Sequence, residues 1–134
     1  MTKLTEVEGI GETYAAKLAE AGIATTEALL EQGATPKGRA TIEEKTGISG
    51  KLVLKWVNRV DLFRIKGIGE EYADLLEIAG VDTVPDLARR NPENLYQKLV
   101  EVNEQRKLVR KVPSLSQVNG WIGEAKSLPR VLTY

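Results

Sequence analysis

Two tight turns of identical composition, Gly9-Ile10-Gly11 and Gly67-Ile68-Gly69, are the stretches whose residue types are best suited to bind a ligand. A helical pattern of apolar residues follows each turn at once, so each turn lies at the start of a helix. The first N–H groups of a helix have no partner within it and lie at the positive end of its dipole. Both turns are therefore candidate anion sites.

Glutamates beside both turns favour a structural role instead. Glu12 follows the first turn, and Glu70 and Glu71 follow the second. A carboxylate in the first turn of a helix interacts favourably with the dipole, but it repels a phosphate that approaches the same amides. Glycine also permits a positive φ and close helix packing without any ligand. We therefore interpret Gly9, Ile10, Gly11 and their counterparts as structural hairpin turns.

A third turn, Gly47-Ile48-Ser49, is better placed to bind an anion, because basic residues follow it instead of acidic ones. Lys51 and Lys55 lie two and six residues after the serine. Lysines beside free helix amides can contact a phosphate backbone, and each such contact releases counterions. We predict a nucleic-acid or anion site formed by Gly47, Ile48, Ser49, Lys51, Lys55 and Arg59.

The composition offers few groups for catalysis. The 134 residues include no cysteine and no histidine, which removes the thiolate, the commonest metal ligand and the commonest general base. No apolar run approaches the roughly 18 residues of a membrane span, and the first residues lack the apolar core of a signal peptide. We expect a cytoplasmic, non-enzymatic protein without a metal, a cofactor or a small-molecule substrate.

An internal repeat organises the chain. The segment from Gly9 recurs from Gly67, an offset of 58 residues, and Trp56 recurs as Trp121, an offset of 65. The larger second offset implies a longer connection in the second half, which we place between Glu104 and Pro113. The chain therefore contains two units of roughly 60 residues. We expect these units at residues 1–64 and 65–134, packed as one compact body.

Helical patterns fill both units, and no stretch alternates for long enough to be a strand. Glycines, prolines and capping residues mark the expected ends. The last residues are expected to be a short extended segment. We predict helices from Gly11 to Gly22, Thr25 to Gly33, Thr35 to Gly47, Ser49 through Val60, Gly69 to Gly80, near Thr83, Asn91 through Val102, and Ser116 to Ser127.

The two tryptophans lie on predicted apolar faces and are expected to anchor the core, while Tyr14 and Tyr72 are expected to pack against the hairpins. The remaining core positions come from the apolar side of each predicted helix. The predicted core comprises Leu18, Leu29, Val53, Trp56, Leu76, Leu87, Leu99, Val118 and Trp121.

The hairpins resemble a known motif. Two short helices joined by a Gly-hydrophobic-Gly turn, with Ala15 or Ala73 four positions after the second glycine, are similar to the helix-hairpin-helix motif of DNA repair and recombination proteins. The twin tryptophans and the ending Leu128-Pro129-Arg130-Val131 resemble the DUF4332 family of uncharacterised bacterial helix-hairpin-helix proteins. The resemblance implies an all-α, tandem helix-hairpin-helix (SAM-domain-like) bundle. In DNA-binding relatives of this fold, it implies hairpin amides that bind a phosphate, often with a monovalent cation.

The net charge of zero hides an alternation along the chain. Residues 1–34 carry two basic and six acidic side chains (net −4), residues 35–66 eight and three (+5), residues 67–104 three and nine (−6), and residues 105–134 six and one (+5). The basic quarters can follow a phosphate backbone. Acidic and basic quarters can also complement each other within or between molecules, or can simply be solvated helix faces.

Two functions follow from these patterns. The resemblance implies a non-catalytic module that binds the backbone of duplex DNA independently of sequence. The alternative is a protein–protein interaction or self-assembly module that uses the alternating acidic and basic faces. Fold-level analogy alone supports the first function, and the glutamates at the intact turns favour the second.

Overall fold

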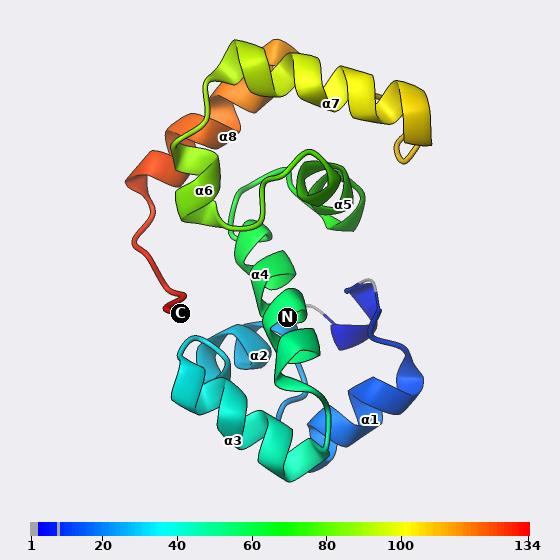
Figure 1. The fold of residues 1–134 in the computed structure, drawn as a ribbon, viewed down its shortest axis with the longest axis vertical. Helices are drawn as coiled ribbons and strands as arrows, with labels where there is room; N and C mark the ends of the chain where they lie inside the picture. The colour runs from blue at the N-terminus through cyan, green and yellow to red at the C-terminus, as the bar shows by residue number, and fades with distance from the viewer. Residues whose placement is uncertain (1–2, 8) are drawn as a thin grey trace. The chain divides into compact units, whose positions relative to one another are not determined.

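Helical periodicity and local caps produce an all-helical chain (Figure 1). This computed structural model describes residues 3–7 and 9–134; Met1, Thr2 and Glu8 lie outside the described residues. Within the described part there is no strand, only an isolated antiparallel bridge between Lys3 and Thr25. None of the described helices has the length and apolar character needed to cross a membrane. The elements in order are η1 (Leu4–Glu6), α1 (Glu12–Glu20), α2 (Thr26–Gln32), α3 (Pro36–Thr46), α4 (Gly50–Leu62), α5 (Glu70–Ile78), α6 (Val84–Ala88), α7 (Pro92–Arg106) and α8 (Leu115–Ser127).

Side-chain caps set the starts of several helices. Thr25 Oγ1 accepts a hydrogen bond of 3.1 Å from the N–H three residues later, and Thr35 and Asn91 do the same at 3.0 Å. Ser114 and Gln117 form a reciprocal capping box at the start of α8. Each of these bonds satisfies an N–H group that has no partner inside its helix. These helices begin within a residue or two of the predicted positions because caps are local signals.

Contacts divide the chain into two compact units. Unit 1 consists of Met1–Asp61 together with Val131–Tyr134, and unit 2 consists of Leu62–Arg130. The sequence places the boundary at residue 64 and assigns the last residues to the second unit. In the structure, these last four residues belong to unit 1, so the whole of unit 2 lies between two segments of unit 1 along the chain.

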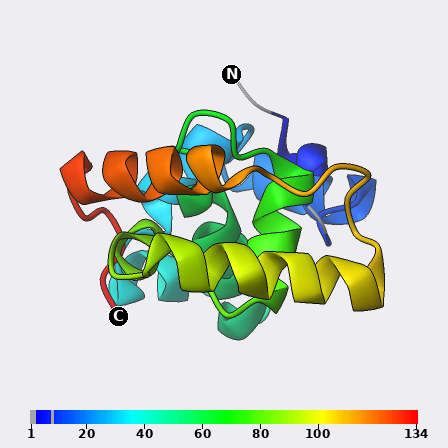
Figure 2. The ribbon, with the colours of Figure 1, turned by 90° about the horizontal axis from the view of Figure 1, so that it is seen from above.

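Each unit has its own helix packing. In unit 1, α3 contacts both α1 and α2, and α1 contacts η1. In unit 2, α8 packs against α6 and α7, and α7 also contacts α5. The two long helices α7 and α8 lie side by side and antiparallel (Figures 1 and 2).

The predicted core residues are all buried. Those of unit 2 belong to one contiguous cluster that also includes Ile68, Ala73 and Val81. Burial of apolar surface is the main favourable term in folding, so these helices are held mainly by their apolar sides. The apolar periodicity of the sequence therefore identified the core side correctly for the helices that carry these residues.

The connection in the second half is longer than its counterpart between α3 and α4, as predicted, but it lies two residues further along the chain. The sequence places it between Glu104 and Pro113, but α7 continues to Arg106 and ends at Lys107. Lys107 adopts a left-handed φ of 52°, a conformation that glycine usually supplies, so the sequence carries no obvious stop signal there. Asn103 then holds the connection with paired side-chain bonds to the N–H and carbonyl of Val109, at 3.0 and 3.1 Å.

Candidate functional site

The two Gly-Ile-Gly turns have the same backbone geometry. Gly9 has a φ of 92° and Gly67 a φ of 93°, in a region that side-chain-bearing residues rarely adopt. The isoleucine that follows each glycine is buried, and its N–H donates to the carbonyl three residues earlier, at 3.0 Å for Ile10 and 3.1 Å for Ile68. The central side chain of each turn therefore belongs to the interior of its unit.

A tryptophan indole lies against the first glycine of each turn. A Cβ atom placed on Gly9 would lie 3.2 Å from Trp56 Nε1, and one on Gly67 would lie 3.3 Å from Trp121 Nε1. Tyr14 packs against the first indole at a ring distance of 5.1 Å, and Tyr72 packs against the second at 5.3 Å. The indole N–H of Trp56 is buried and has no hydrogen-bond partner among the described residues. Glycine is thus required here for helix packing.

Acidic residues lie in the first turn of the helix that follows each Gly-Ile-Gly turn. Gly11 and Gly69 are the N-cap residues of α1 and α5, and neither has a side chain that could accept from the helix amides. The first turn of α1 carries Glu12, and that of α5 carries Glu70 and Glu71. These carboxylates place negative charge where an incoming phosphate would bind.

The two N–H groups that follow the Gly47-Ile48-Ser49 turn already have hydrogen-bond acceptors. Gly47 ends α3 with a φ of 73°. The N–H of Gly50 donates to Glu43 Oε2 at 3.0 Å, and the N–H of Lys51 donates to Ser49 Oγ at 3.2 Å. A carboxylate from α3 therefore occupies the position at the start of α4 that the sequence assigns to a phosphate. Seven residues separate Glu43 from Gly50, and this contact was not foreseen.

The structure brings two of the three predicted basic residues to one surface. Lys51 and Lys55 are exposed on α4 and lie four residues apart, so they share a face. Arg59 is only 5% exposed. An α-helix has 3.6 residues per turn, so each four-residue step rotates the position by about 40°. Two such steps carry Arg59 from the exposed face to the buried side, which removes it from a surface patch.

Unit 1 contains a second candidate site, the contact surface that Ala34, Arg39 and Asn58 form around the segment Val131–Tyr134, which we call the groove. The N–H of Thr133 donates to the carbonyl of Ala34 at 2.8 Å. The carbonyl of Thr133 accepts from Arg39 Nη2 at 2.7 Å. Both backbone groups of one residue are therefore paired, the N–H with a backbone carbonyl and the carbonyl with a side chain.

Side-chain contacts add to these backbone hydrogen bonds. Leu132 is 1% exposed, and Tyr134 donates its hydroxyl hydrogen to Asn58 Oδ1 at 3.0 Å. The guanidinium of Arg39 lies 5.8 Å from the centre of the Tyr134 ring, within the range of a cation–π contact. Its Nη1 also donates to the carbonyl of Gly33 at 2.8 Å. The groove thus combines backbone bonds, a buried apolar side chain and an aromatic contact.

Arg39 is a candidate site residue that the sequence does not predict. It is only 7% exposed and comes from α3, whose other buried residue is Ile42. The spacing of three residues from Ile42 places Arg39 on the apolar side of the helix, which is the one local signal of its burial. Its partners Gly33 and Thr133 are separated by most of the chain, so no motif could have revealed them.

These features define an all-helical chain of two units, each with a Gly-Ile-Gly turn closed by a tryptophan. Residues 8–128 match the family model DUF4332, which is described as a domain of unknown function. The match spans most of the chain, and the chain therefore belongs to the DUF4332 family. No solved structure matches it.

Proposed function

We propose that this chain is a non-catalytic, tandem helix-hairpin-helix module that binds other proteins through extended peptide segments. The hairpin part of this proposal is supported by the two turns, because each joins a preceding element to a helix with the same positive φ and the same tryptophan contact. The fold alone does not define a function, so the function must come from a site.

The observation that carries the proposal is the way unit 1 holds Val131–Tyr134. Thr133 is paired through both its N–H and its carbonyl, while Leu132 is buried. Main-chain hydrogen bonds supply affinity for any extended peptide, and pockets for side chains supply specificity. A partner segment with an apolar residue followed by threonine and tyrosine would make the same contacts. Arg39 is the central residue of this recognition.

The test is binding of the segment in trans. A chain that ends at Arg130 is mixed with a fluorescent peptide of residues 128–134, and anisotropy is measured. We expect saturable binding to the shortened chain and much weaker binding to the full chain, whose own segment fills the groove. The substitution Arg39→Leu in the shortened chain should weaken binding by about tenfold or more, since it removes charge-assisted hydrogen bonds.

The control is Arg106→Leu, the same substitution at an exposed arginine at the end of α7. It should leave peptide binding unchanged. A shortened chain that remains helical by circular dichroism but does not bind the peptide would contradict the proposal. Equal binding by the Arg39→Leu and native shortened chains would contradict the role of Arg39.

A second candidate function is sequence-independent binding of duplex DNA. Two exposed lysines on one face of α4, Lys51 and Lys55, favour it. The carboxylate of Glu43 at the start of the same helix opposes it. Phosphate contacts should make binding weaken steeply with salt, and the double substitution Lys51→Glu/Lys55→Glu should weaken it further. Absence of binding at about 50 mM salt would exclude this candidate.

A further inference from the structure

Each unit contains a small pocket where three helices meet. In unit 1, the pocket has a volume of about 320 Å³ and lies between the ends of α1 and α2 and the side of α3 that runs from its cap Thr35 to Lys45 in its last turn. In unit 2, a pocket of about 340 Å³ lies between the ends of α5 and α6 and the first turns of α7. Ala21 and Ala79, the C-cap residues of α1 and α5, occupy the same place in the two pockets.

The charged residues that line both pockets are all basic. Lys37 and Lys45 line the pocket of unit 1, and Arg89, Arg90 and Lys98 line that of unit 2. No acidic residue lines either one. This matters because residues 1–34 and 67–104, which supply parts of the two walls, are acidic overall. The positive charge is therefore local to the pockets.

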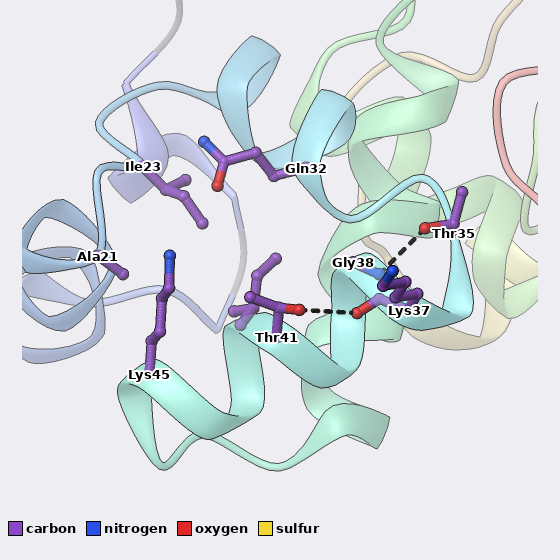
Figure 3. A pocket seen from close by; sticks show the side chains of 9 residues that line it. Ala21, Ile23, Gln32, Thr35, Lys37, Gly38, Thr41 and Lys45 are labelled. Carbon is purple, nitrogen blue, oxygen red and sulfur yellow. Dashed lines mark hydrogen bonds between the residues drawn. The ribbon is translucent and has the colours of Figure 1, made fainter.

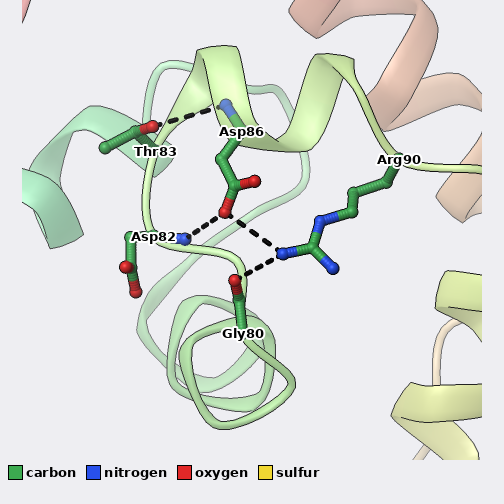
Figure 4. A network of polar contacts seen from close by, with 5 residues as sticks. All are labelled: Gly80, Asp82, Thr83, Asp86 and Arg90. Carbon is green, nitrogen blue, oxygen red and sulfur yellow. Dashed lines mark hydrogen bonds and ion pairs between the residues drawn. The ribbon is translucent and has the colours of Figure 1, made fainter.

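One of these cations already has a structural role. Arg90 Nη2 donates to the carbonyl of Gly80 at 2.6 Å and lies 3.4 Å from Asp86 Oδ2 (Figure 4). The same carboxylate accepts from the N–H of Asp82 at 3.3 Å, so these four residues form one network. Arg90 thus neutralises the end of α5, as a cation at a helix C-terminus does. It forms a fixed wall of its pocket.

The other four basic side chains make no such bond. Lys37, Lys45, Arg89 and Lys98 are exposed, and their charged groups form no hydrogen bond or ion pair with another described residue. Figure 3 shows the ammonium of Lys45 and the amide of Gln32 directed toward each other across the pocket of unit 1. Each pocket therefore has two cations that are available to a ligand.

The rest of the lining is apolar or neutral. Ile23 and Ile42 are buried side chains at the base of the unit 1 pocket, and Leu95 has the same role in unit 2. The N-cap residues beside the pockets are Thr35 and Asn91, which accept helix N–H bonds without adding negative charge. The positive ends of α3 and α7 therefore add to the basic side chains.

We propose that these two pockets bind phosphate monoesters of small organic molecules. A phosphate monoester carries about −1.5 to −2 charges at neutral pH, which matches the two available cations of each pocket. Volumes of 320 and 340 Å³ are at the small end of the range for ligand sites, so the organic part has few atoms. The apolar base contacts that part. This inference is independent of the peptide groove, because Arg39 lines neither pocket.

The experiment is a titration of the full chain with phenyl phosphate, followed by amide NMR. We expect saturable shifts at Thr41 and Ile42 in unit 1 and at Asn94 and Leu95 in unit 2. Inorganic phosphate should bind more weakly at the same positions because it lacks an apolar part. Phenol, the neutral counterpart, should cause no saturable shift.

Substitutions separate the two pockets. Lys45→Gln should weaken binding in unit 1 by about tenfold and leave unit 2 unchanged, and Lys98→Gln should have the reverse effect, since each removes one charge-assisted contact. Lys55→Gln, an exposed lysine outside both pockets, is the matched control. Native affinity in both lysine variants, equal loss in the control, or equal binding of phenol would overturn the proposal. None of these results would alter peptide binding at Arg39, so the two proposals fail separately.

Discussion

The third helix of unit 1 and the third helix of unit 2 begin alike and then differ at one buried position. Both start with a capping residue followed by proline, Thr35-Pro36 in α3 and Asn91-Pro92 in α7. Four residues after the cap, α3 carries Arg39 and α7 carries Leu95, and both side chains are buried. The leucine joins the core of unit 2, whereas the arginine binds an extended segment. The equivalent position therefore serves core packing in unit 2 and hydrogen bonding to distant backbone in unit 1.

A second difference lies one residue earlier in the same helices. The third residue of α3 is Gly38, and the corresponding residue of α7 is Asn94. A Cβ atom on Gly38 would lie 2.0 Å from the carbonyl oxygen of Gln32. The end of α2 therefore approaches α3 closely enough to exclude any side chain. In unit 2 the same position holds an asparagine, so the packing around the first turn of α7 leaves room for a side chain.

The largest expected effect comes from filling this close approach. Gly38→Ala should destabilise the protein by about 3 kcal/mol, because a backbone carbonyl must move to accept the new methyl group. Denaturant unfolding followed by circular dichroism measures the change. The control is Gly123→Ala in α8, where a Cβ meets nothing within 4 Å and alanine should be neutral or stabilising by up to about 1 kcal/mol. Equal effects at the two positions would show that the approach of α2 to α3 does not require glycine at Gly38.

The next effect tests the arginine itself. Arg39→Leu, which makes α3 resemble α7, should destabilise unit 1 by about 2 kcal/mol because the carbonyls of Gly33 and Thr133 lose a charged donor. Hydrogen exchange at Thr133 should become fast as the segment leaves its groove. Arg106→Leu provides the matched control. Unchanged protection of the Thr133 amide would show that the segment is held without Arg39.

The hairpin glycines test a feature that the two units share, a positive φ beside a tryptophan indole. Gly9→Ala and Gly67→Ala should each destabilise the protein by about 1–2 kcal/mol, since both require a positive φ and a contact with an indole. The two losses should be equal within about 0.5 kcal/mol. Thermal unfolding of the two variants, with Gly123→Ala as the unstrained control, gives the comparison. A loss at only one position would mean that the turns differ in their packing.

The smallest effect concerns the caps. Thr35→Ala and Asn91→Ala should each destabilise the protein by about 1 kcal/mol, because each leaves one helix N–H without its acceptor. Threonine and asparagine are both good caps, so the two units should lose similar amounts. Urea unfolding resolves changes of this size. Serine at either position should restore most of the loss, and failure of serine to do so would point to a role beyond capping.

Much of the fold could be predicted from local signals. Capping residues indicate where helices start, because a cap accepts a hydrogen bond from an N–H only three residues away. These caps are Thr25, Thr35, Asn91 and Ser114. Lys107 gave no such signal, since a lysine rarely adopts a left-handed φ. The candidate site was harder to predict. Lys51 and Lys55 are exposed as the sequence suggests, but Arg59 turns into the interior because the helix rotates by about 40° for every four residues.

By itself, the sequence determined the helices, the main apolar positions of the core and the two glycine turns, because these depend on neighbours within a few residues. Only the tertiary structure decided which polar groups meet. The carboxylate of Glu43 accepts a hydrogen bond from the N–H of Gly50 at the start of α4, and Arg39 donates one to the carbonyl of Thr133. Basic side chains line one pocket in each unit. These contacts join residues from different helices and distant parts of the chain, and the packing of those helices sets their distances. The candidate sites of recognition therefore lie in the groove and the pockets between helices and not at the repeated turns.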